Sequence, residues 1–456
     1  MIQSTEDTIC AVSTAPGVGG IAVIRVSGKD AIRIVDEVWL GKKLSSVAAR
    51  TAHLGDLSDD KGGILDNAVA TVFRAPASFT GEDVVEISVH GSAWIQRELI
   101  NILIKHGCRM AEPGEFTRRA FLSGRMDLAE AEAVADVIAS SSRASHRIAV
   151  SQMKGRFSSH LSELRDRLMD LASLLELELD FSEEDVEFAS RERLLEIACQ
   201  VNDTVSSLAS SFADGQALKS GVPVALVGSP NAGKSTLLNN LLGDERAIVS
   251  DIPGTTRDTV EEVIEIDGVN FRIIDTAGLR DTSDKVERLG IERSFRQIEQ
   301  AKVVVLVVDP AQSGDEIKGM LDEIDGRTDD MSVIIVAKNK NDIAPMEIDL
   351  PERYSQVSIS AKRGEGVDRL KAMLLDASGV KNWESDRIVT NARHYEALIN
   401  AQNAIVRVIE GLNAGISGDF IAQDVRETIH YLGEITGTIT TDQILTTIFL
   451  RFCIGK

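Results

Sequence analysis

An octapeptide that matches the pattern G-x-x-x-x-G-K-[ST] constrains the fold of this chain more than any other feature. It runs from Gly228 to Ser235, follows the apolar run 222–227 and precedes a helical pattern over 236–242. In that context the loop amides surround phosphate oxygens, and the N-terminus of the helix adds positive potential. Lys234 is expected to reach the terminal phosphates, and Ser235 is expected to bind Mg²⁺.

Apolar runs of strand length alternate with helical patterns around this loop. They lie at 222–227, 269–274, 303–309, 332–337 and 356–360. Nearly continuous apolar strands indicate a sheet that is buried on both faces, which is typical of a doubly wound α/β domain. We expect this domain to cover residues 221–379.

Three short motifs follow the octapeptide in a fixed order. In 275–278 (DTAG) the Asp can hold the metal through its water shell, and the Gly can donate its N–H to the terminal phosphate. In 339–342 (NKND), Asp342 can accept hydrogen bonds from the N1–H and the 2-amino group of guanine. Adenine lacks both donors, so bound ATP would leave a buried carboxylate unpaired. With 360–362 (SAK) to support the base, the set predicts a GTP-specific, Ras-like domain and disfavours an ATP-binding module.

The segment 254–258 (GTTRD) is a candidate switch loop, in which Thr256 would complete the Mg²⁺ shell. Leu279 follows the DTAG motif, where Ras-type enzymes carry a Gln that orients water. Either hydrolysis is slow, or another group takes over this task. The side-chain oxygen of Asn231 and backbone oxygens of the switch loop could coordinate a monovalent cation. The residues themselves leave Asp284 and Glu287 open as the acid that positions water.

The segments on either side of the α/β domain differ from it. The first 120 residues show short β-branched runs and read as mixed α/β. Apolar residues then recur at helical spacing over 161–175, 194–212 and 395–435, which favours a helix bundle. An α/β domain inserted into one helical domain is the economical interpretation, although two separate helical domains would fit as well. We predict a multi-domain fold with an α/β domain over 1–118, a helical domain over 119–220 and 380–456, and the G domain over 221–379.

Charge and cysteine content limit the partners and the cellular compartment expected for the chain. The net charge of −22 argues against broad, non-specific binding to nucleic acid. Residues 105–167, with 11 Lys and Arg against 8 Asp and Glu, form the segment most suited to a polyanion, although a solvated helical surface explains them equally well. The four cysteines lie far apart, and the sequence shows neither an export signal nor an apolar run of membrane-spanning length. We expect a cytoplasmic protein without stable membrane association.

Several longer segments resemble the MnmE (TrmE) family of tRNA modification GTPases. They are FTGEDVVE (79–86), PGEFTRRAFLSGRMDLAEAEAVADVI (113–138), GSPNAGKS, DIPGTTRD, DTAGLRDTSDKVERLGIERS and the terminal FCIGK. The resemblance extends over essentially the whole chain. It implies an N-terminal folate-binding domain that forms homodimers, and a helical domain divided by the G domain. It also implies an FAD-dependent partner of the MnmG (GidA) type, with which a heterotetramer forms.

The resemblance further implies a reaction. Potassium-stimulated GTP hydrolysis would accompany the addition of an aminomethyl-type (carboxymethylaminomethyl) group to C5 of the wobble uridine in tRNA. A 5-formyl- or methylene-tetrahydrofolate would supply the one-carbon unit. The alternative is a GTP-dependent switch or assembly factor whose partner alone performs the chemistry.

The family motifs assign roles to individual residues. The resemblance implies that Asn231, Ser250, Ile252 and Thr255 bind K⁺, that Ser235 and Thr256 bind Mg²⁺, and that Glu287 positions the attacking water. It implies folate contacts for Arg25, Glu86, Arg125 and Lys456, and catalytic roles for Glu287 and Cys453. Lys234 is the third expected catalytic residue, from the phosphate-loop motif itself. The expected GTP-binding residues are Gly228, Asn231, Ala232, Gly233, Lys234, Ser235, Thr236, Ser250, Asp251, Ile252, Pro253, Gly254, Thr255, Thr256, Asp275, Thr276, Ala277, Gly278, Asn339, Lys340, Asp342, Ser360, Ala361 and Lys362.

Cys453 stands near the end of the chain and has three interpretations. It can be a thiolate nucleophile toward the uracil ring, a contact in the folate site, or a packed structural cysteine. The sequence of the tail argues against prenylation, because Gly455 and Lys456 do not fit a prenylation box.

Overall fold

A computed structural model describes residues 7–180, 191–243, 262–274, 298–328, 332–379, 387–450, 452 and 454–455. Packing divides the chain into two compact units. The first comprises residues 1–135, 151–201 and 403–456, and the second comprises residues 136–150 and 202–402. The four segments expected from the sequence remain a prediction, since the two units are defined by packing alone.

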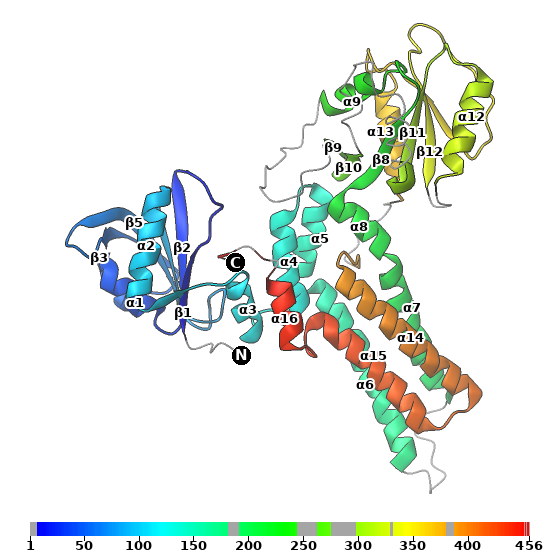
Figure 1. Ribbon diagram of the computed structural model, residues 1–456. Coiled ribbons are helices and arrows are strands. Elements are labelled where there is room, and N and C mark those ends of the chain that lie inside the picture. The colour runs from blue at the N-terminus through cyan, green and yellow to red at the C-terminus, as the bar shows by residue number, and fades with distance from the viewer. Residues whose placement is uncertain are drawn as a thin grey trace. The chain divides into compact units, whose positions relative to one another are not determined.

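A seven-stranded sheet forms the N-terminal part of the first unit (Figure 1). Its order is β3-β4-β5-β6-β2-β1-β7, and every pairing is antiparallel except that of β1 with β7. The strands are β1 (Thr8–Val12), β2 (Ile21–Ser27), β3 (Trp39–Leu40), β4 (Thr51–Ser58), β5 (Ile64–Phe73), β6 (Val84–His90) and β7 (Cys108–Met110). The β-branched runs noted in the sequence lie in β2, β5 and β6, which confirms their strand character.

Helices cover both faces of this sheet. The apolar stripes of α1 (Ala31–Val38) and α2 (Ala93–Lys105) pack with one face of the sheet into a single core. Helix α3 (Glu115–Leu122) packs elsewhere, because its Phe116 joins Ile9 and Ala11 of β1 in a separate cluster. Since Ile9 and Ala11 alternate with Cys10 of the larger core, α3 covers the opposite face of β1.

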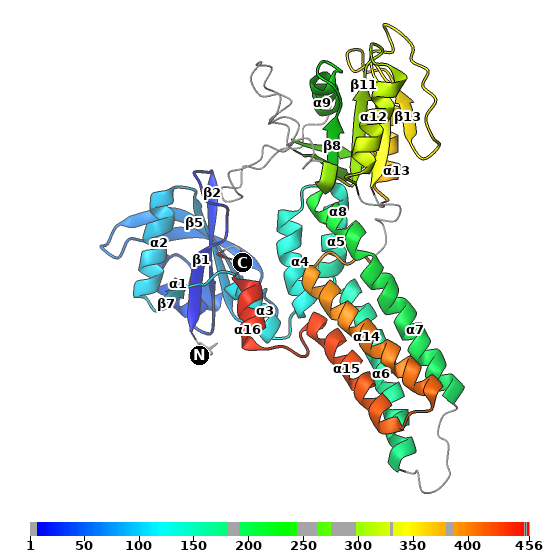
Figure 2. The same ribbon diagram turned by 45° about the vertical axis from the view of Figure 1, so that its right-hand side comes forward.

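The rest of the first unit is helical. Helices α6 (Arg156–Asp180) and α15 (Gly418–Thr436) lie side by side (Figure 1, Figure 2). Helix α16 (Asp442–Phe449) packs on α3 and on the start of α4 (Leu128–Ala139) through a cluster that includes Leu128, Phe449 and Phe452. Helices α4, α5 (Arg143–Met153), α7 (Arg191–Ser210) and α14 (Ala392–Ala414) fall partly in each unit. The helical spacing seen over 161–175, 194–212 and 395–435 is thus confirmed as α6, α7, α14 and α15.

The second unit contains a six-stranded sheet in the order β13-β12-β11-β8-β10-β9. All pairings are parallel except that of β9 with β10. Its elements are β8 (Val222–Val227), β9 (Glu262–Ile266), β10 (Val269–Ile273), β11 (Val303–Val308), β12 (Val333–Lys338), β13 (Ser355–Ser358), α8 (Phe212–Ser220), α9 (Lys234–Gly243), α12 (Gly314–Asp325) and α13 (Val367–Ala377).

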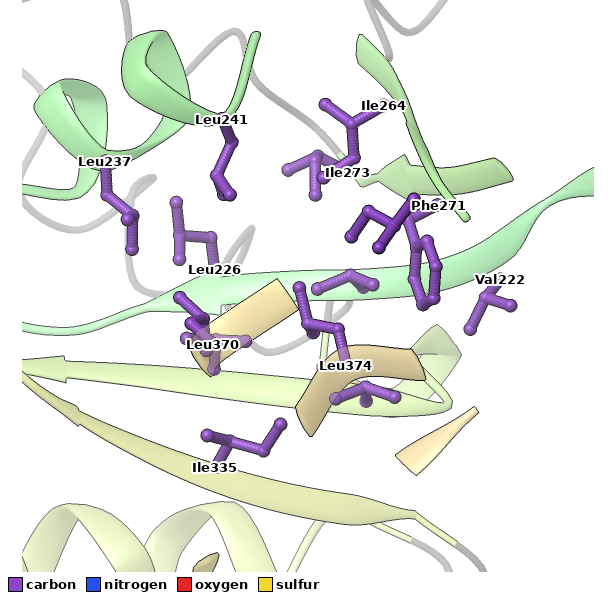
Figure 3. Close-up of a cluster of buried hydrophobic side chains, with 14 of the residues drawn as sticks. Val222, Leu226, Leu237, Leu241, Ile264, Phe271, Ile273, Ile335, Leu370 and Leu374 are labelled. Atoms are coloured by element: carbon purple, nitrogen blue, oxygen red, sulfur yellow. The ribbon is translucent and has the colours of Figure 1, made fainter. Parts of the chain in front are cut away.

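Helices pack on both faces of this second sheet. Leu237 and Leu241 of α9 and Leu370 of α13 pack with Leu226 and Ile335 in one core (Figure 3). Helix α12 packs through its own apolar stripe with the opposite face of β11 and β12. The doubly wound architecture expected from the apolar runs is therefore confirmed. Across the described residues, no helix combines the length and apolarity needed to cross a membrane.

Candidate functional site

The loop between β8 and α9 adopts the tight turn that the octapeptide predicts. Gly228 has φ +145°, and a Cβ at this position would lie 2.2 Å from the carbonyl oxygen of Val307. Gly233 has φ +101°, and its Cβ would lie 2.2 Å from Nδ2 of Asn339. Only glycine fits at either position, because the backbone of the loop passes directly against β11 and the NKND segment. Asn231 adopts a left-handed conformation with φ 64° and is exposed.

Lys234 begins α9 and folds back over the loop. Its Nζ donates hydrogen bonds to the carbonyl oxygens of Gly228 at 2.7 Å and of Ser229 at 2.9 Å. Burial lowers the pKa of Lys234 from its ordinary value. The ammonium group is thus held at the phosphate loop, where an anionic phosphate would stabilise its partly buried positive charge.

Asn339 connects the phosphate loop with the NKND and SAK segments. Its side chain is buried, and Nδ2 donates to the carbonyl oxygen of Ala232 at 2.7 Å. Its Oδ1 accepts a hydrogen bond of 2.9 Å from the backbone N–H of Ala361. A single buried amide therefore fixes the phosphate loop relative to the NKND and SAK segments.

Asp342 lies at the edge of the same group. Its carboxylate accepts a hydrogen bond of 2.8 Å from Oγ of Ser360 and lies 3.5 Å from Nε of Arg363. The hydrogen bond from Ser360 lowers the pKa of Asp342, and the nearby positive charges of Arg363 and Lys362 lower it further. The carboxylate is therefore an anionic acceptor, as recognition of guanine N–H groups requires. Lys340, with φ 60°, forms an ion pair with Asp309 at the end of β11.

The described residues among the predicted GTP contacts gather at the carboxyl ends of β8, β12 and β13, where ligands of doubly wound sheets bind. The remaining predicted residues lie outside the described part of the chain. These are Ser250, Asp251, Ile252, Pro253, Gly254, Thr255, Thr256, Asp275, Thr276, Ala277, Gly278, Asp284 and Glu287.

Two of the candidate folate residues, Arg25 and Glu86, meet on the N-terminal sheet. Arg25 of β2 and Glu86 of β6 are direct cross-strand partners, and their side chains form an ion pair with 2.8 Å between Nη2 and Oε1. The guanidinium carbon of Arg25 lies 5.2 Å from the ring centroid of Phe79 and 5.6 Å from that of Phe116. Only 14% of the Arg25 side chain is exposed, so two aromatic rings and one carboxylate hold this charge in place.

The loop 79–82 brings Arg125 to the same region. A Cβ at Gly81 would lie 3.3 Å from Cγ of Arg125, so these two residues are neighbours. Oγ of Ser123 donates a hydrogen bond of 2.7 Å to the carbonyl oxygen of Thr80 and ties the end of α3 to the loop. The aromatic partners Phe79 and Phe116 were not among the predicted site residues. Both lie within segments that carry the family resemblance, which is the signal that could have identified them.

A buried ion network supports this loop. Arg119 of α3 is nearly fully buried and contacts the carboxylates of Asp7 at 2.7 Å, Glu82 at 3.1 Å and Glu115 at 3.0 Å. Burial alone would raise the pKa of Glu115, but hydrogen bonds and charge from Arg109 and Arg119 lower it below its ordinary value. The Glu115 carboxylate therefore stays ionised, and the ion pairs of Arg119 with Glu115 and Glu82 tie α3 to the loop 79–82.

The C-terminal tail reaches the N-terminal sheet. The carbonyl oxygen of Gly455 accepts a hydrogen bond of 3.1 Å from Oγ of Ser13, which follows β1. Within β1, Ala11 is the cross-strand partner of Arg25. Cys453 and Lys456 themselves lie outside the described residues.

Two family models match the chain. The model described as the MnmE helical domain matches residues 128–453, and the model described as the GTP-binding protein TrmE N-terminus matches residues 8–125. The first match alone spans more than half of the 456 residues.

Curated relatives are similar over the whole length of the chain. The tRNA modification GTPase MnmE of Parabacteroides distasonis is 52% identical over 461 residues, with 98% of this chain and 100% of the relative covered. The tRNA modification GTPase MnmE of Bacteroides thetaiotaomicron is 48% identical over 465 residues, with coverages of 99% and 100%. Among solved structures, the G domain of the T. maritima FeoB iron transporter is 26% identical with a TM-score of 0.25, and covers 34% of this chain and 98% of its own.

Proposed function

The chain belongs to the MnmE family of tRNA modification GTPases, and from that premise we propose the reaction that its GTP hydrolysis serves. As a member of this family it is a GTP hydrolase that acts in tRNA modification. On our proposal, it works with an FAD-dependent partner to add an aminomethyl-type (carboxymethylaminomethyl) group to C5 of the wobble uridine. The ion pair of Arg25 with Glu86 carries this proposal. It lies in a different compact unit from the candidate nucleotide site, so the chain offers a second polar site at which a reactant other than GTP can bind.

Different residues of the proposed nucleotide site have different roles. The Lys234 ammonium neutralises the terminal phosphates, and the hydroxyl of Ser235, an exposed residue at the start of α9, is the first proposed Mg²⁺ ligand. Thr256 is the second proposed Mg²⁺ ligand. Since Leu279 has no group that can orient water, we assign that task to Glu287.

A monovalent cation fits the exposed side of the phosphate loop. Asn231 holds a left-handed conformation there, and its side-chain oxygen is a hard ligand that suits K⁺. Oxygens of Ser250, Ile252 and Thr255 are proposed to complete the coordination. The bound cation would supply positive charge next to the phosphates, where other GTPases use an arginine.

The charge pattern of the second site fits a reduced folate. Arg25 and Arg125 suit the carboxylates of the folate tail, and Glu86 can accept hydrogen bonds from ring N–H groups. Lys456 would add a further cation from the C-terminal tail. A bound 5-formyl- or methylene-tetrahydrofolate supplies the one-carbon unit, while the protein groups bind and orient it. Cys453 is proposed as a catalytic residue of this tail.

The proposed assembly is a homodimer formed through the N-terminal domains, joined by the MnmG-type partner in a heterotetramer. The tRNA is the shared substrate of this assembly. We place its action in the cytoplasm, in keeping with the scattered cysteines of the sequence.

Equilibrium binding of 5-formyl-tetrahydrofolate to the full chain tests the second site. We expect Arg25→Gln to lower the affinity at least about tenfold, because a charge-assisted hydrogen bond is worth about 1.5–3 kcal/mol. Arg33→Gln is the matched control, since Arg33 lies in the same domain but on the exposed surface of α1. Absence of folate binding to the wild-type chain would contradict the proposal and favour the alternative of a GTP-dependent switch. Unchanged affinity in Arg25→Gln would contradict the assigned site.

A further inference from the structure

The β9–β10 hairpin occupies a special place in the G domain. In the sequence it lies between the candidate switch loop 254–258 and the DTAG motif 275–278. Asp267 and Gly268 form its two-residue turn with φ 49° and 83°, a conformation that makes tight hairpins. Five residues of β10 pair with β9, but only three pair with β8. The hairpin is therefore more firmly paired with itself than with the rest of the sheet.

The tip of the hairpin contacts the start of α5. The carbonyl oxygen of Gly268 accepts a hydrogen bond of 3.0 Å from the backbone N–H of Ala144. Ala144 lies in the first turn of α5, where backbone N–H groups have no partner within the helix. The hairpin thus caps this helix, and its carbonyl dipole is favourable at the positive helix end.

Asn270 makes a second contact with the same segment. Its Nδ2 donates a hydrogen bond of 2.9 Å to Oγ of Ser141, just before α5. The residue is buried, yet its Oδ1 has no hydrogen-bond partner among the described residues. A buried amide oxygen without a hydrogen-bond partner is unfavourable, so its presence at this contact calls for an explanation other than stability.

Apolar packing reinforces both hydrogen bonds. Ala144 and Ile148 of α5 belong to the same buried cluster as Phe271 and Ile273 of β10. Figure 3 labels these two residues of β10. Because buried side chains are close-packed, a shift of β10 cannot occur without a response from the first turns of α5. The last residues of α5 already belong to the other compact unit, which begins again at residue 151.

We propose that Asn270 and Ser141 are positioning residues that transmit the nucleotide state of the G domain to α5 through the β9–β10 hairpin. The inference rests on the nucleotide site proposed above. The hairpin joins both nucleotide-contacting segments, and its tip holds the helix that leads out of the unit. A change at either segment then biases the position of α5 through a continuous set of contacts.

Hydrogen exchange of the full chain tests this coupling. Peptides that cover 142–150 are compared with GDP and with a non-hydrolysable GTP analogue bound. We expect the wild-type exchange rates to differ by about threefold or more between the two nucleotides, because one hydrogen bond is worth about 0.5–1.5 kcal/mol. Asn270→Ala and Ser141→Ala should each reduce that difference to less than about 1.5-fold.

Two further variants separate coupling from simple loss of structure. Ser141→Thr keeps the hydroxyl acceptor and is expected to retain the wild-type difference. Asp267→Asn changes the exposed turn next to the contact, keeps a residue that tolerates its conformation, and should also retain it. Two results would overturn the coupling alone, provided that nucleotides bind normally. One is an unchanged difference in exchange rate between the two nucleotides in both alanine variants, and the other is the absence of such a difference in the wild-type chain. Failure of the wild-type chain to bind the GTP analogue would instead refute the nucleotide site, and the coupling with it.

Discussion

The hydroxyl of Ser13 donates a hydrogen bond of 3.1 Å to the carbonyl oxygen of Gly455, which lies 442 positions later in the chain. Gly455 has φ +94°, and a Cβ at this position would lie 2.2 Å from the carbonyl oxygen of Val12. The tail can therefore approach β1 this closely only with glycine at position 455. This contact places the C-terminal residues next to the strand that pairs with Arg25.

The first prediction concerns this tail. Gly455→Ala should displace the tail from β1 and lower the affinity for 5-formyl-tetrahydrofolate about tenfold, since left-handed strain and the clash with Val12 together cost more than about 1–3 kcal/mol. GTP hydrolysis should stay within about twofold of wild type, because Gly455 and the candidate nucleotide site belong to different compact units. Ile454→Ala alters an exposed neighbour and serves as the control. Wild-type folate affinity in Gly455→Ala would show that the tail has no part in the site.

The second prediction concerns the monovalent cation. Steady-state GTP hydrolysis is measured in KCl and in NaCl at equal ionic strength. The wild-type chain should hydrolyse GTP faster in KCl, and Asn231→Ala should abolish the difference by removing one cation ligand. A K⁺ response that persists in full in Asn231→Ala would rule out this residue as a ligand.

The third prediction concerns the choice of purine. Asp342→Asn replaces a double acceptor by an amide that has one acceptor and one donor. We expect the affinity for GTP to fall by about 100-fold, because two hydrogen bonds to a charged group are lost or weakened. Xanthosine triphosphate, which carries a carbonyl in place of the 2-amino group, should bind this variant better than GTP. Unchanged GTP affinity in titrations of Asp342→Asn would contradict the assigned role.

The fourth prediction follows from a histidine between two carboxylates. Nδ1 of His106 lies 2.8 Å from Glu37, and Nε2 lies 3.0 Å from Asp60. The hydrogen bond with Glu37 has the largest effect and that with Asp60 the next largest, and both raise the pKa of His106 above its ordinary value of 6.5. Because the folded state holds this proton more tightly than the unfolded state, protonated His106 stabilises the fold. This stabilisation is complete below pH 6.5 and is lost as the pH rises through the raised pKa of the folded state.

Calorimetric melting of the wild-type chain at pH 6 and at pH 9 measures this contribution. The groups are partly exposed, so we expect the loss of stability with rising pH to be about 1 kcal/mol or less. His106→Gln should remove this part of the pH dependence. The same dependence in His106→Gln as in wild type would mean that other groups cause it.

Local spacing predicted the tight turn of the phosphate loop. The phosphate loop needs glycine at Gly228 and Gly233 and a lysine at the start of a helix, and these requirements are visible in eight consecutive residues. The order of apolar runs also predicted the doubly wound sheet. Both features depend on short-range pattern, which a single sequence records directly.

Contacts between distant segments were not predictable in this way. The pairing of Arg25 with Glu86 depends on the register of β2 and β6. The hydrogen bond from the backbone N–H of Ala144 to the carbonyl oxygen of Gly268 depends on how the β9–β10 hairpin packs against α5. The burial of Arg119 among three carboxylates depends on the packing of α3. None of these has a local signature, because each joins residues that only the tertiary fold brings together.

The central claim is that this chain is needed to modify C5 of the wobble uridine. Mass-spectrometric analysis of wobble nucleosides in tRNA from cells that lack the protein tests it most directly. The aminomethyl-type uridine should disappear from these cells, return with the wild-type chain, and fail to return with Asp342→Asn. Undiminished modification in cells without the protein would contradict the account.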